Sequence, residues 1–420
     1  MDDWFIDHDR WRSVSSVINL PMAATMNKFV NFAKMADIGE PSWNAAAAQG
    51  LTHIVVDHVS GNRLRTNEHE FINMCSCSYL GLDTDERILE GAKRGIDQAR
   101  TLHLTTARVR ILISLLEELE EALSRHYDCH AMSYNSCAAA TSAFLPLLAS
   151  GLLTEGARPI LVVDKSSHFS INHVLAICGD ETEVITCPHN DLDFVDQICS
   201  KNPNVAFIGD GTYSMGGHAP VEGLLQLQKR HGLFLYFDDS HGLSTTHEKG
   251  WGHVRGLAGR LGDRTAIVGS LAKAFGACGG VLMFGNPAIK NTLIRYGNSW
   301  SQYLNSAGIG AVGASLEIHR TDEICRRQTM LWNNVALFDE LVRPEDAGTP
   351  SPIRLIRIPT PESANDIARR IFQRGFYTSP VFFPIVRRGS AGLRVMLRSN
   401  VARDEIEAFS AILSEELGRA

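Results

Sequence analysis

The sequence predicts an α/β protein, with a mainly parallel sheet covered by helices and a smaller C-terminal α/β unit. From about residue 128, short apolar runs alternate with amphipathic runs, and several apolar runs contain no polar position. Strands that are apolar throughout are typical of a sheet buried on both faces. Strands that alternate with helices favour parallel pairing.

Five runs are predicted strands: residues 160–164, 205–210, 233–238, 266–270 and 281–284. The helix predicted over 221–231 ends at Gly232, a residue type that commonly follows a helix. In such sheets the ligand binds beyond the carboxyl ends of the strands. The polar residues that end these strands are therefore the candidates for chemistry.

We expect three regions along the chain: an N-terminal arm (1–70), a large domain (71–305) and a small C-terminal domain (306–420). A chain of 420 residues is long enough for more than one hydrophobic core. A long helical stretch is predicted from about 306 to 342. Pro344, Gly348, Pro350 and Pro352 then mark the boundary of a second α/β unit over 353–420.

Composition argues against several classes of function. The net charge of −7 gives no basic footprint for nucleic acid, and no apolar run of about 20 residues predicts a membrane span. The acidic start lacks the order of a secretory signal, so we expect a cytoplasmic protein. Nine scattered cysteines indicate reduced thiols. The six-residue spacing of His241, His247 and His253 does not suit a metal site.

Two predicted strand ends carry reactive side chains. Asp238 begins Asp-Asp-Ser-His, where a carboxylate can pair with a protonated pyridine nitrogen. Lys273 follows the next strand within Ser-Leu-Ala-Lys-Ala-Phe-Gly, in small and apolar surroundings that suit a nucleophilic amine. Taken alone, Asp238 is as readily a helix cap, and Lys273 an ordinary surface lysine.

Two more stretches add a phosphate cradle and a flat ring. Tyr134-Asn-Ser-Cys-Ala-Ala-Ala opens an apolar helix, and free amides at a helix start bind phosphate. His168 follows another strand end, where its imidazole can stack on a ring. Alone, Ser136 is a plain helix cap and His168 a structural histidine. Together, in this chain order, the four stretches predict a pyridoxal 5′-phosphate (PLP) site with Lys273 as the Schiff-base lysine.

The chain resembles the α-oxoamine synthase family of fold-type I PLP enzymes. The resemblance implies a seven-stranded, mainly parallel sheet with a smaller C-terminal domain. It is most specific in the segment 210–220, just before Asp-Asp-Ser-His. The matching stretches are 79–82, 135–141, 164–170, 189–191, 210–220, 238–241, 270–280 and 392–395.

By position, the resemblance implies a role for each matched residue. Lys273 bonds the cofactor, Asp238 pairs with the ring nitrogen, His168 stacks on the ring and His241 binds the ring hydroxyl. The further cofactor contacts are Ser136, Cys137, Ala138, Asp210, Ser270 and, across a homodimer interface, Ser301.

For the substrate, the resemblance implies contacts from Ser78, Tyr79, Arg108 and Arg394. Arg394 would hold the carboxylate of an amino acid through a bidentate fork. Arg108 and Arg398 compete for this role. If the strand continues past Arg394, residues 394 and 398 share a face and can act together.

The chain departs from the family pattern at several places. His103–Arg108 replaces a Gly-rich segment that ends Ser-Arg, and Ser78 replaces an asparagine. Ser399–Ala402 replaces Ala-x-His-Thr, and Asn305-Ser306 replaces a Pro-Pro pair. Because these departures lie where substrates bind in the family, the resemblance bears more directly on the cofactor than on the substrates.

The resemblance implies that the chain forms a carbon–carbon bond between an amino acid and an acyl thioester, delivered by coenzyme A or a carrier protein. Loss of the carboxylate usually follows and leaves an α-amino ketone. The alternative is an aminotransferase-like enzyme, which needs the same lysine and no acyl donor. A third interpretation is a non-catalytic scaffold, and the presence of Lys273 with its partners argues against it.

Overall fold

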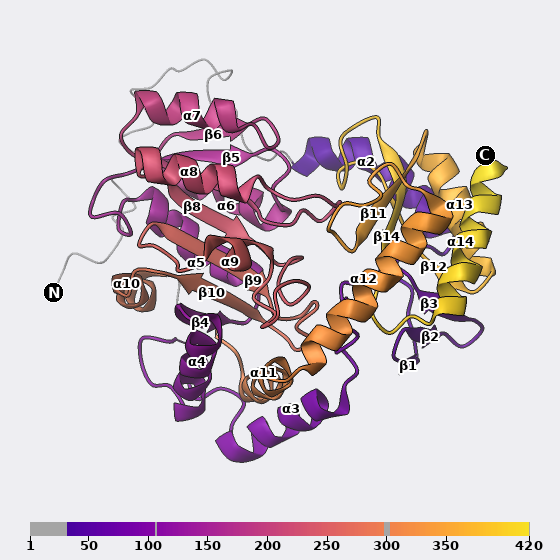
Figure 1. The fold of residues 1–420 in the computed structure, drawn as a ribbon, viewed down its shortest axis with the longest axis horizontal. Coiled ribbons are helices and arrows are strands. Elements are labelled where there is room, and N and C mark those ends of the chain that lie inside the picture. Colours follow the sequence, from indigo (N-terminus) through magenta and orange to yellow (C-terminus); the bar gives the residue numbers. More distant parts are fainter. Residues whose placement is uncertain (1–31, 106, 298–302, 420) are drawn as a thin grey trace, which may run out of the picture.

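The structure of the protein is a computed structural model that describes residues 32–105, 107–297 and 303–419. A large α/β part and a smaller one lie side by side, and the long helix α12 (Glu323–Val342) runs diagonally between them (Figure 1). The predicted fold class is confirmed.

The large part is built on a seven-stranded sheet. The neighbouring strands β9, β8, β7, β5 and β6 pair in parallel, whereas β10 is antiparallel to both of its neighbours. Six strands therefore end at one edge of the sheet, and the five predicted strands are among the seven. The order is β4 (His130–Tyr134), β10 (Gly280–Phe284), β9 (Thr265–Ser270), β8 (Phe234–Asp238), β7 (Val205–Asp210), β5 (Ile160–Asp164), β6 (Val184–Cys187).

Helices cover both faces of this sheet, and β7, β8 and β9 are consequently buried at every residue. The predicted helix is α8 (Val221–His231), and it ends at Gly232 with φ of 69°. One core contains α8 with α4 (Ser114–Tyr127), α7 (Leu192–Lys201), α9 (His253–Ala258) and α11 (Ser306–His319). The other contains α5 (Cys137–Ala149), α6 (Phe169–Glu181) and α10 (Ala288–Tyr296).

The smaller part combines both ends of the described chain. Its three-stranded sheet has the order β11 (Ile353–Ile358), β14 (Ala391–Met396), β13 (Ser379–Val381), packed with α13 (Pro361–Gln373) and α14 (Arg403–Gly418). A second sheet has the order β1 (His58–Ser60), β2 (Arg63–Arg65), β3 (Glu70–Asn73), β12 (Phe376–Tyr377).

The described portion of the predicted arm packs against C-terminal elements. Ala46 of α2 (Phe32–Ala48) and Leu51 lie in the same core as residues of β14 and α14. β3 also pairs in parallel with β12. The domain bounds at residues 70 and 305 remain predictions.

The helical stretch predicted from 306 to 342 is in fact two helices. α11 ends at His319 because the N–H groups of Arg320 and Thr321 bond back to carbonyls of the last turn. The chain then turns, and Thr321 Oγ1 accepts the N–H of Glu323 at 3.3 Å as α12 begins. The predicted continuous helix is therefore wrong at residues 320–322.

The described residues contain neither a helix that could cross a membrane nor a cluster that could hold a metal ion. No helix among them combines the length and apolar character that crossing a membrane requires. Nor do three or more of their His, Cys, Asp or Glu side chains gather in a way that could hold a metal ion.

Helices α3 (Glu86–Ala99) and α11 cross at very close range. Gly91 and Gly95 of α3 face Gly310 of α11, and a Cβ at Gly91 would lie 2.7 Å from the Gly310 carbonyl oxygen. The absence of side chains is what lets the two backbones touch. This contact fixes α3, whose start lies directly after the segment 78–82, close to the candidate site.

Gly95→Ala is expected to lower the free energy of unfolding by about 1–3 kcal/mol. The added Cβ would overlap the Ser306 carbonyl oxygen and lie 2.9 Å from Gly310 N. Gly313→Ala in α11 is the matched control, because its Cβ would meet nothing within 4 Å. The control should gain up to about 1 kcal/mol from helix propensity. Urea unfolding measures both, and equal stabilities would contradict the account of this contact.

Candidate active site

Polar residues end four strands at the same edge of the large sheet: Asp164 on β5, Asp210 on β7, Asp238 on β8 and Ser270 on β9. Asp210 lies opposite Asp238 in the parallel ladder, and both side chains are buried. Burial, followed by the charge of Asp238, raises the pKa of Asp210 well above its usual range. Two adjacent buried carboxyl groups favour a cation at this edge.

The Asp238 carboxylate is held at both oxygens. Oδ1 accepts the backbone N–H of Ser240 at 3.0 Å, and Oδ2 accepts the Cys137 thiol at 3.3 Å. Burial, followed by the charge of Asp238, raises the pKa of Cys137 well above its usual range, so the thiol keeps its proton and donates. Within 32–105, 107–297 and 303–419, no lysine or arginine forms an ion pair with Asp238. Its charge can therefore pair with a bound cation.

The Lys273 amine faces a buried histidine. Nζ lies 2.8 Å from His241 Nε2, and His241 Nδ1 lies 2.7 Å from the Tyr79 hydroxyl. Burial, followed by the charges of Lys273 and Arg394, holds the pKa of His241 well below its usual range. A neutral imidazole accepts a hydrogen bond at one nitrogen and donates at the other. His241 therefore links Lys273 to Tyr79, whose own pKa burial raises well above the usual range.

The start of α5 offers backbone donors for an anion. The N-cap Ser136 accepts the N–H of Ala139 at 3.0 Å. The N–H groups of Cys137 and Ala138 have no acceptor among the residues that the structure describes. Gly280 lets β10 pass close by, since a Cβ there would lie 2.5 Å from Cys137 N. Unpaired amides at a helix start suit a phosphate.

His168 stands at the start of α6, where its N–H donates to Asp210 Oδ1 at 2.9 Å. Partial burial lowers the pKa of His168, and the charges of Asp238, Lys273 and Arg394 also act on it. The imidazole therefore lies among the other predicted site residues. The residue is also exposed, as stacking on a flat ligand requires.

Arg394, on β14, lies beside the Cys75 thiol and keeps one buried donor unused. Its Nε is buried and has no partner among the described residues. Its charge lowers the pKa values of His168 and His241, so the guanidinium lies within electrostatic range of both. A guanidinium with an unmet donor at this place suits a carboxylate ligand.

The two other arginines predicted for the carboxylate site already form ion pairs within the protein. Arg108 Nη1 lies 2.8 Å from Glu120 Oε1, and Arg398 Nη2 lies 2.7 Å from Asp83 Oδ1. Both guanidinium groups are buried. The prediction that Arg398 shares a strand face with Arg394 is wrong, because β14 ends before residue 398.

Of the remaining predicted site residues, three lie in the described part of the chain and one does not. Ser78 and Tyr79 are buried, and Ser78 Oγ accepts the N–H of Asp83 at 3.3 Å. Ser270 lies at the sheet edge, and its Oγ accepts the N–H of Ala272 at 3.3 Å. Ser301 lies outside the described residues.

Sequence reasoning missed the part played by Asp239. Its Oδ2 accepts the N–H of Val254 at 2.9 Å, and its Oδ1 accepts the Thr212 hydroxyl at 3.1 Å. Burial raises the pKa of Asp239 to about 7. This carboxyl group ties together the loops that follow β7 and β8 and so supports Asp238. The Asp-Asp doublet at the strand end was the available signal.

Comparisons with known proteins give the family of the chain. The model of the family "aminotransferase class I and II" matches residues 69–413. An 8-amino-7-oxononanoate synthase of Fervidobacterium nodosum is 27% identical over 84% of this chain and 90% of its own length. The same enzyme of Coprothermobacter proteolyticus is 29% identical over 83% and 89%.

Solved structures agree on the fold. Serine palmitoyltransferase of Sphingomonas wittichii superposes with a TM-score of 0.80, at 20% identity, over 93% of this chain and 98% of its own. An SPT structure that holds PLP gives the same TM-score, at 18% identity, over 93% and 99%. The 8-amino-7-oxononanoate synthase of Francisella tularensis gives 0.68, at 20% identity, over 83% and 98%.

Proposed function

The chain belongs to the aminotransferase class I and II family, and we propose that it is a PLP-dependent α-oxoamine synthase, which joins an amino acid to an acyl thioester. The observation that carries this proposal is the Lys273 amine, held against neutral His241 at the sheet edge where Asp238 lies buried beside Asp210.

The described residues fit the cofactor at each point where it needs a partner. Asp238, buried and without an ion-pair partner, fits the protonated ring nitrogen. The free amides of Cys137 and Ala138 fit the phosphate, with Ser136 and Ser270 beside them. Lys273 fits the aldehyde carbon, His168 the ring face and His241 the ring hydroxyl.

When bound, PLP supplies an aldehyde and a ring that withdraws electrons from the α-carbon of an amino acid. The side chains of the protein hold and move the protons. The Asp238 carboxylate, fixed at both oxygens, keeps a proton on the ring nitrogen. Lys273 Nζ is the amine placed to take the α-proton, and neutral His241 Nε2 accepts a hydrogen bond from it at 2.8 Å. The buried Tyr79 hydroxyl fixes the imidazole from behind.

Arg394 is proposed to orient the amino acid through its carboxylate. Its buried Nε has no hydrogen-bond partner among the described residues, whereas Nη1 of Arg108 binds Glu120 and Nη2 of Arg398 binds Asp83. The net reaction joins the α-carbon to the acyl carbon and releases the thiol, and the carboxylate leaves as carbon dioxide. Because the Arg394 guanidinium fixes the carboxylate, the amino acid is oriented with its α-proton toward Lys273.

An aminotransferase would use the same cofactor residues without an acyl donor. Similarity to 8-amino-7-oxononanoate synthases, at 27% and 29% identity over more than four fifths of the chain, favours the acyl-thioester reaction. Amino-acid-dependent release of thiol from an acyl thioester is the measurement that separates the two.

We also propose that the active form is a homodimer with its sites at the subunit interface and that the protein is cytoplasmic. Four apolar side chains between residues 102 and 111 are more than half exposed, and exposed apolar surface of this kind is typical of an interface. Ser301 is the proposed contact to the cofactor of the partner subunit. Cell fractionation tests the location.

Lys273→Ala is expected to abolish the borohydride-fixed cofactor and all amino-acid-dependent thiol release from acyl thioesters, because no other amine faces His241 at this distance in the described part of the chain. Mass spectrometry of the reduced protein should find the cofactor on the Lys273 peptide of the wild type. Lys229→Ala, at the exposed end of α8, is the control and should behave as wild type. Fixation of PLP at another lysine in Lys273→Ala would refute the assignment.

Arg394→Ala is expected to weaken amino-acid binding at least tenfold while PLP binding and stability stay near wild type. An unpaired carboxylate costs more than 1.4 kcal/mol in such a site, which is tenfold in affinity. Arg108→Ala should show the reverse, with a loss of stability of about 3–5 kcal/mol from breaking its buried pair with Glu120. Arg398→Ala should lose less stability, because the side chain of its partner Asp83 is 36% exposed and solvent screens the charge that remains. Spectral titration with amino acids and urea unfolding separate the two patterns. Wild-type affinity in Arg394→Ala would move the carboxylate site elsewhere.

Sedimentation should find a dimer, and the double substitution Leu104→Asp with Ile111→Asp should convert it to an inactive monomer, because two buried charges would face the partner. Leu104 is 51% and Ile111 is 61% exposed in the single chain. Leu152→Asp is the control, since Leu152 is equally exposed on a turn after α5. A monomer with full activity would contradict the shared site.

A further inference from the structure

The segment 78–82 touches the reactive lysine by two routes. The first route is polar: the Tyr79 hydroxyl lies 2.7 Å from His241 Nδ1, and His241 Nε2 lies 2.8 Å from Lys273 Nζ. Tyr79 is fully buried, so this hydroxyl faces protein rather than solvent. Movement of Tyr79 therefore moves the imidazole that holds the amine.

The second route is steric. Gly276 N donates to the Lys273 carbonyl oxygen at 2.9 Å and closes the turn that carries the lysine. Gly276 has φ of +81°, and a Cβ there would overlap Leu82 and lie 2.9 Å from the Leu82 carbonyl carbon. The turn thus rests directly on the end of the segment 78–82. Both the amine and its backbone depend on where this segment lies.

Arg327 of α12 holds this segment by its carbonyl groups. Its Nη1 donates to Leu80 O at 2.9 Å and lies 3.5 Å from Gly81 O. These carbonyls flank the turn in which Gly81 N donates to Ser78 O at 2.9 Å. One guanidinium nitrogen therefore fixes the backbone next to Tyr79.

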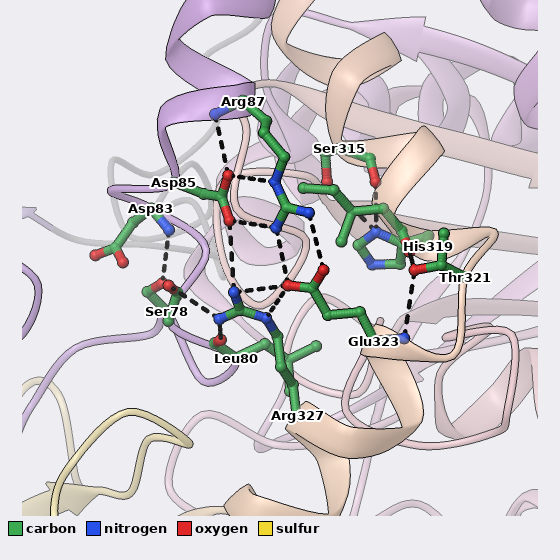
Figure 2. A network of polar contacts seen from close by, with 12 residues as sticks. Ser78, Leu80, Asp83, Asp85, Arg87, Ser315, His319, Thr321, Glu323 and Arg327 are labelled. Atoms are coloured by element: carbon green, nitrogen blue, oxygen red, sulfur yellow. Dashed lines mark hydrogen bonds and ion pairs between the residues drawn. The ribbon is translucent and has the colours of Figure 1, made fainter.

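A four-charge network fixes Arg327 in turn (Figure 2). Arg327 Nη2 lies 2.8 Å from Glu323 Oε1 and 3.4 Å from Asp85 Oδ2. Arg87 binds the same two acids, at 2.7 Å to Asp85 Oδ2 and 2.8 Å to Glu323 Oε1. Hydrogen bonds from Arg87, and then from Arg327, lower the pKa of Glu323 to about 2. Glu323 is therefore ionised at neutral pH.

We propose that Arg327 is a positioning residue for Lys273, acting through the segment 78–82 on Tyr79 and His241. This inference rests on the proposed role of Lys273 as the cofactor lysine. Among the described residues, Arg327 forms no hydrogen bond to a predicted cofactor or substrate residue. It reaches the site only through the Leu80 and Gly81 carbonyl groups. Arg87 binds the same two acids as Arg327, and in the described structure it forms no hydrogen bond to the segment 78–82, which makes it the matched control.

The test is the rate at which apo-protein captures PLP, followed by stopped-flow absorbance. Arg327→Gln is expected to slow capture about tenfold, because the amine loses its fixed orientation. Arg87→Gln should stay within about twofold of wild type. Thermal unfolding of each apo-protein is measured in parallel, because a purely structural role would lower stability in both variants and leave capture unchanged.

A double-mutant cycle tests the route. Tyr79→Phe keeps the ring and removes the hydroxyl, and it should slow capture by a similar factor. If Arg327 acts through Tyr79, Arg327→Gln with Tyr79→Phe should be no slower than Tyr79→Phe alone, within about twofold. Multiplying effects would overturn this route. Capture near the wild-type rate in folded Arg327→Gln would overturn the proposal.

Two further measurements separate failure of this inference from misfolding and from failure of the proposed function. If Arg327→Gln does not fold, Arg327→Lys takes its place, since a lysine keeps the charge and one carbonyl contact but lacks the fork that binds Glu323. It should capture PLP more slowly than Arg87→Gln, and an equal rate counts against the proposal. Mass spectrometry of the borohydride-reduced wild type must find PLP at Lys273. Its absence there refutes the proposed function, whatever the variants do.

Discussion

The contact between Lys273 Nζ and His241 Nε2 is the interaction on which the rest of the site depends. It works only while His241 is neutral, because a protonated imidazole would repel the ammonium group. Burial secures this state, and burial in turn requires that the second ring nitrogen find a partner, which is the Tyr79 hydroxyl at 2.7 Å. The burial of His241, its neutral state and the position of the Lys273 amine therefore depend on one another.

The parallel sheet supplies the negative charge of the site. Because six strands end at one edge, Asp238 and Asp210 lie side by side in a buried place that neither could occupy cheaply alone. The raised pKa of Asp210 lets this carboxyl group keep its proton, which removes the repulsion between the two groups. Two hydrogen bonds stabilise the charge of Asp238. A cationic ring nitrogen would complete the balance, so the sheet edge is arranged for a cofactor rather than for its own stability.

The sequence was sufficient for the sheet and for the sheet edge at which polar residues gather, because both follow from local patterns: apolar strands and the polar residues that end them. It was insufficient where a role depends on a distant partner. Arg394, Arg108 and Arg398 look alike in the sequence, and only Glu120 and Asp83 distinguish them. The same holds for Tyr79, whose partner lies far along the chain, and for Arg320–Asp322, where a single turn divides one predicted helix into two.

Two of the four departures from the family pattern lie at the same turn. Ser78, which replaces an asparagine, accepts the N–H of Asp83, and Asp83 binds Arg398 at 2.7 Å. In the replaced C-terminal motif, Ser399 N donates to Tyr79 O at 2.8 Å, and the Asn400 side chain fills the space that a Cβ at Gly81 would need. Residues that depart in two distant stretches therefore contact the same turn. Because that turn carries Tyr79, both stretches help to fix the hydroxyl group that contacts His241.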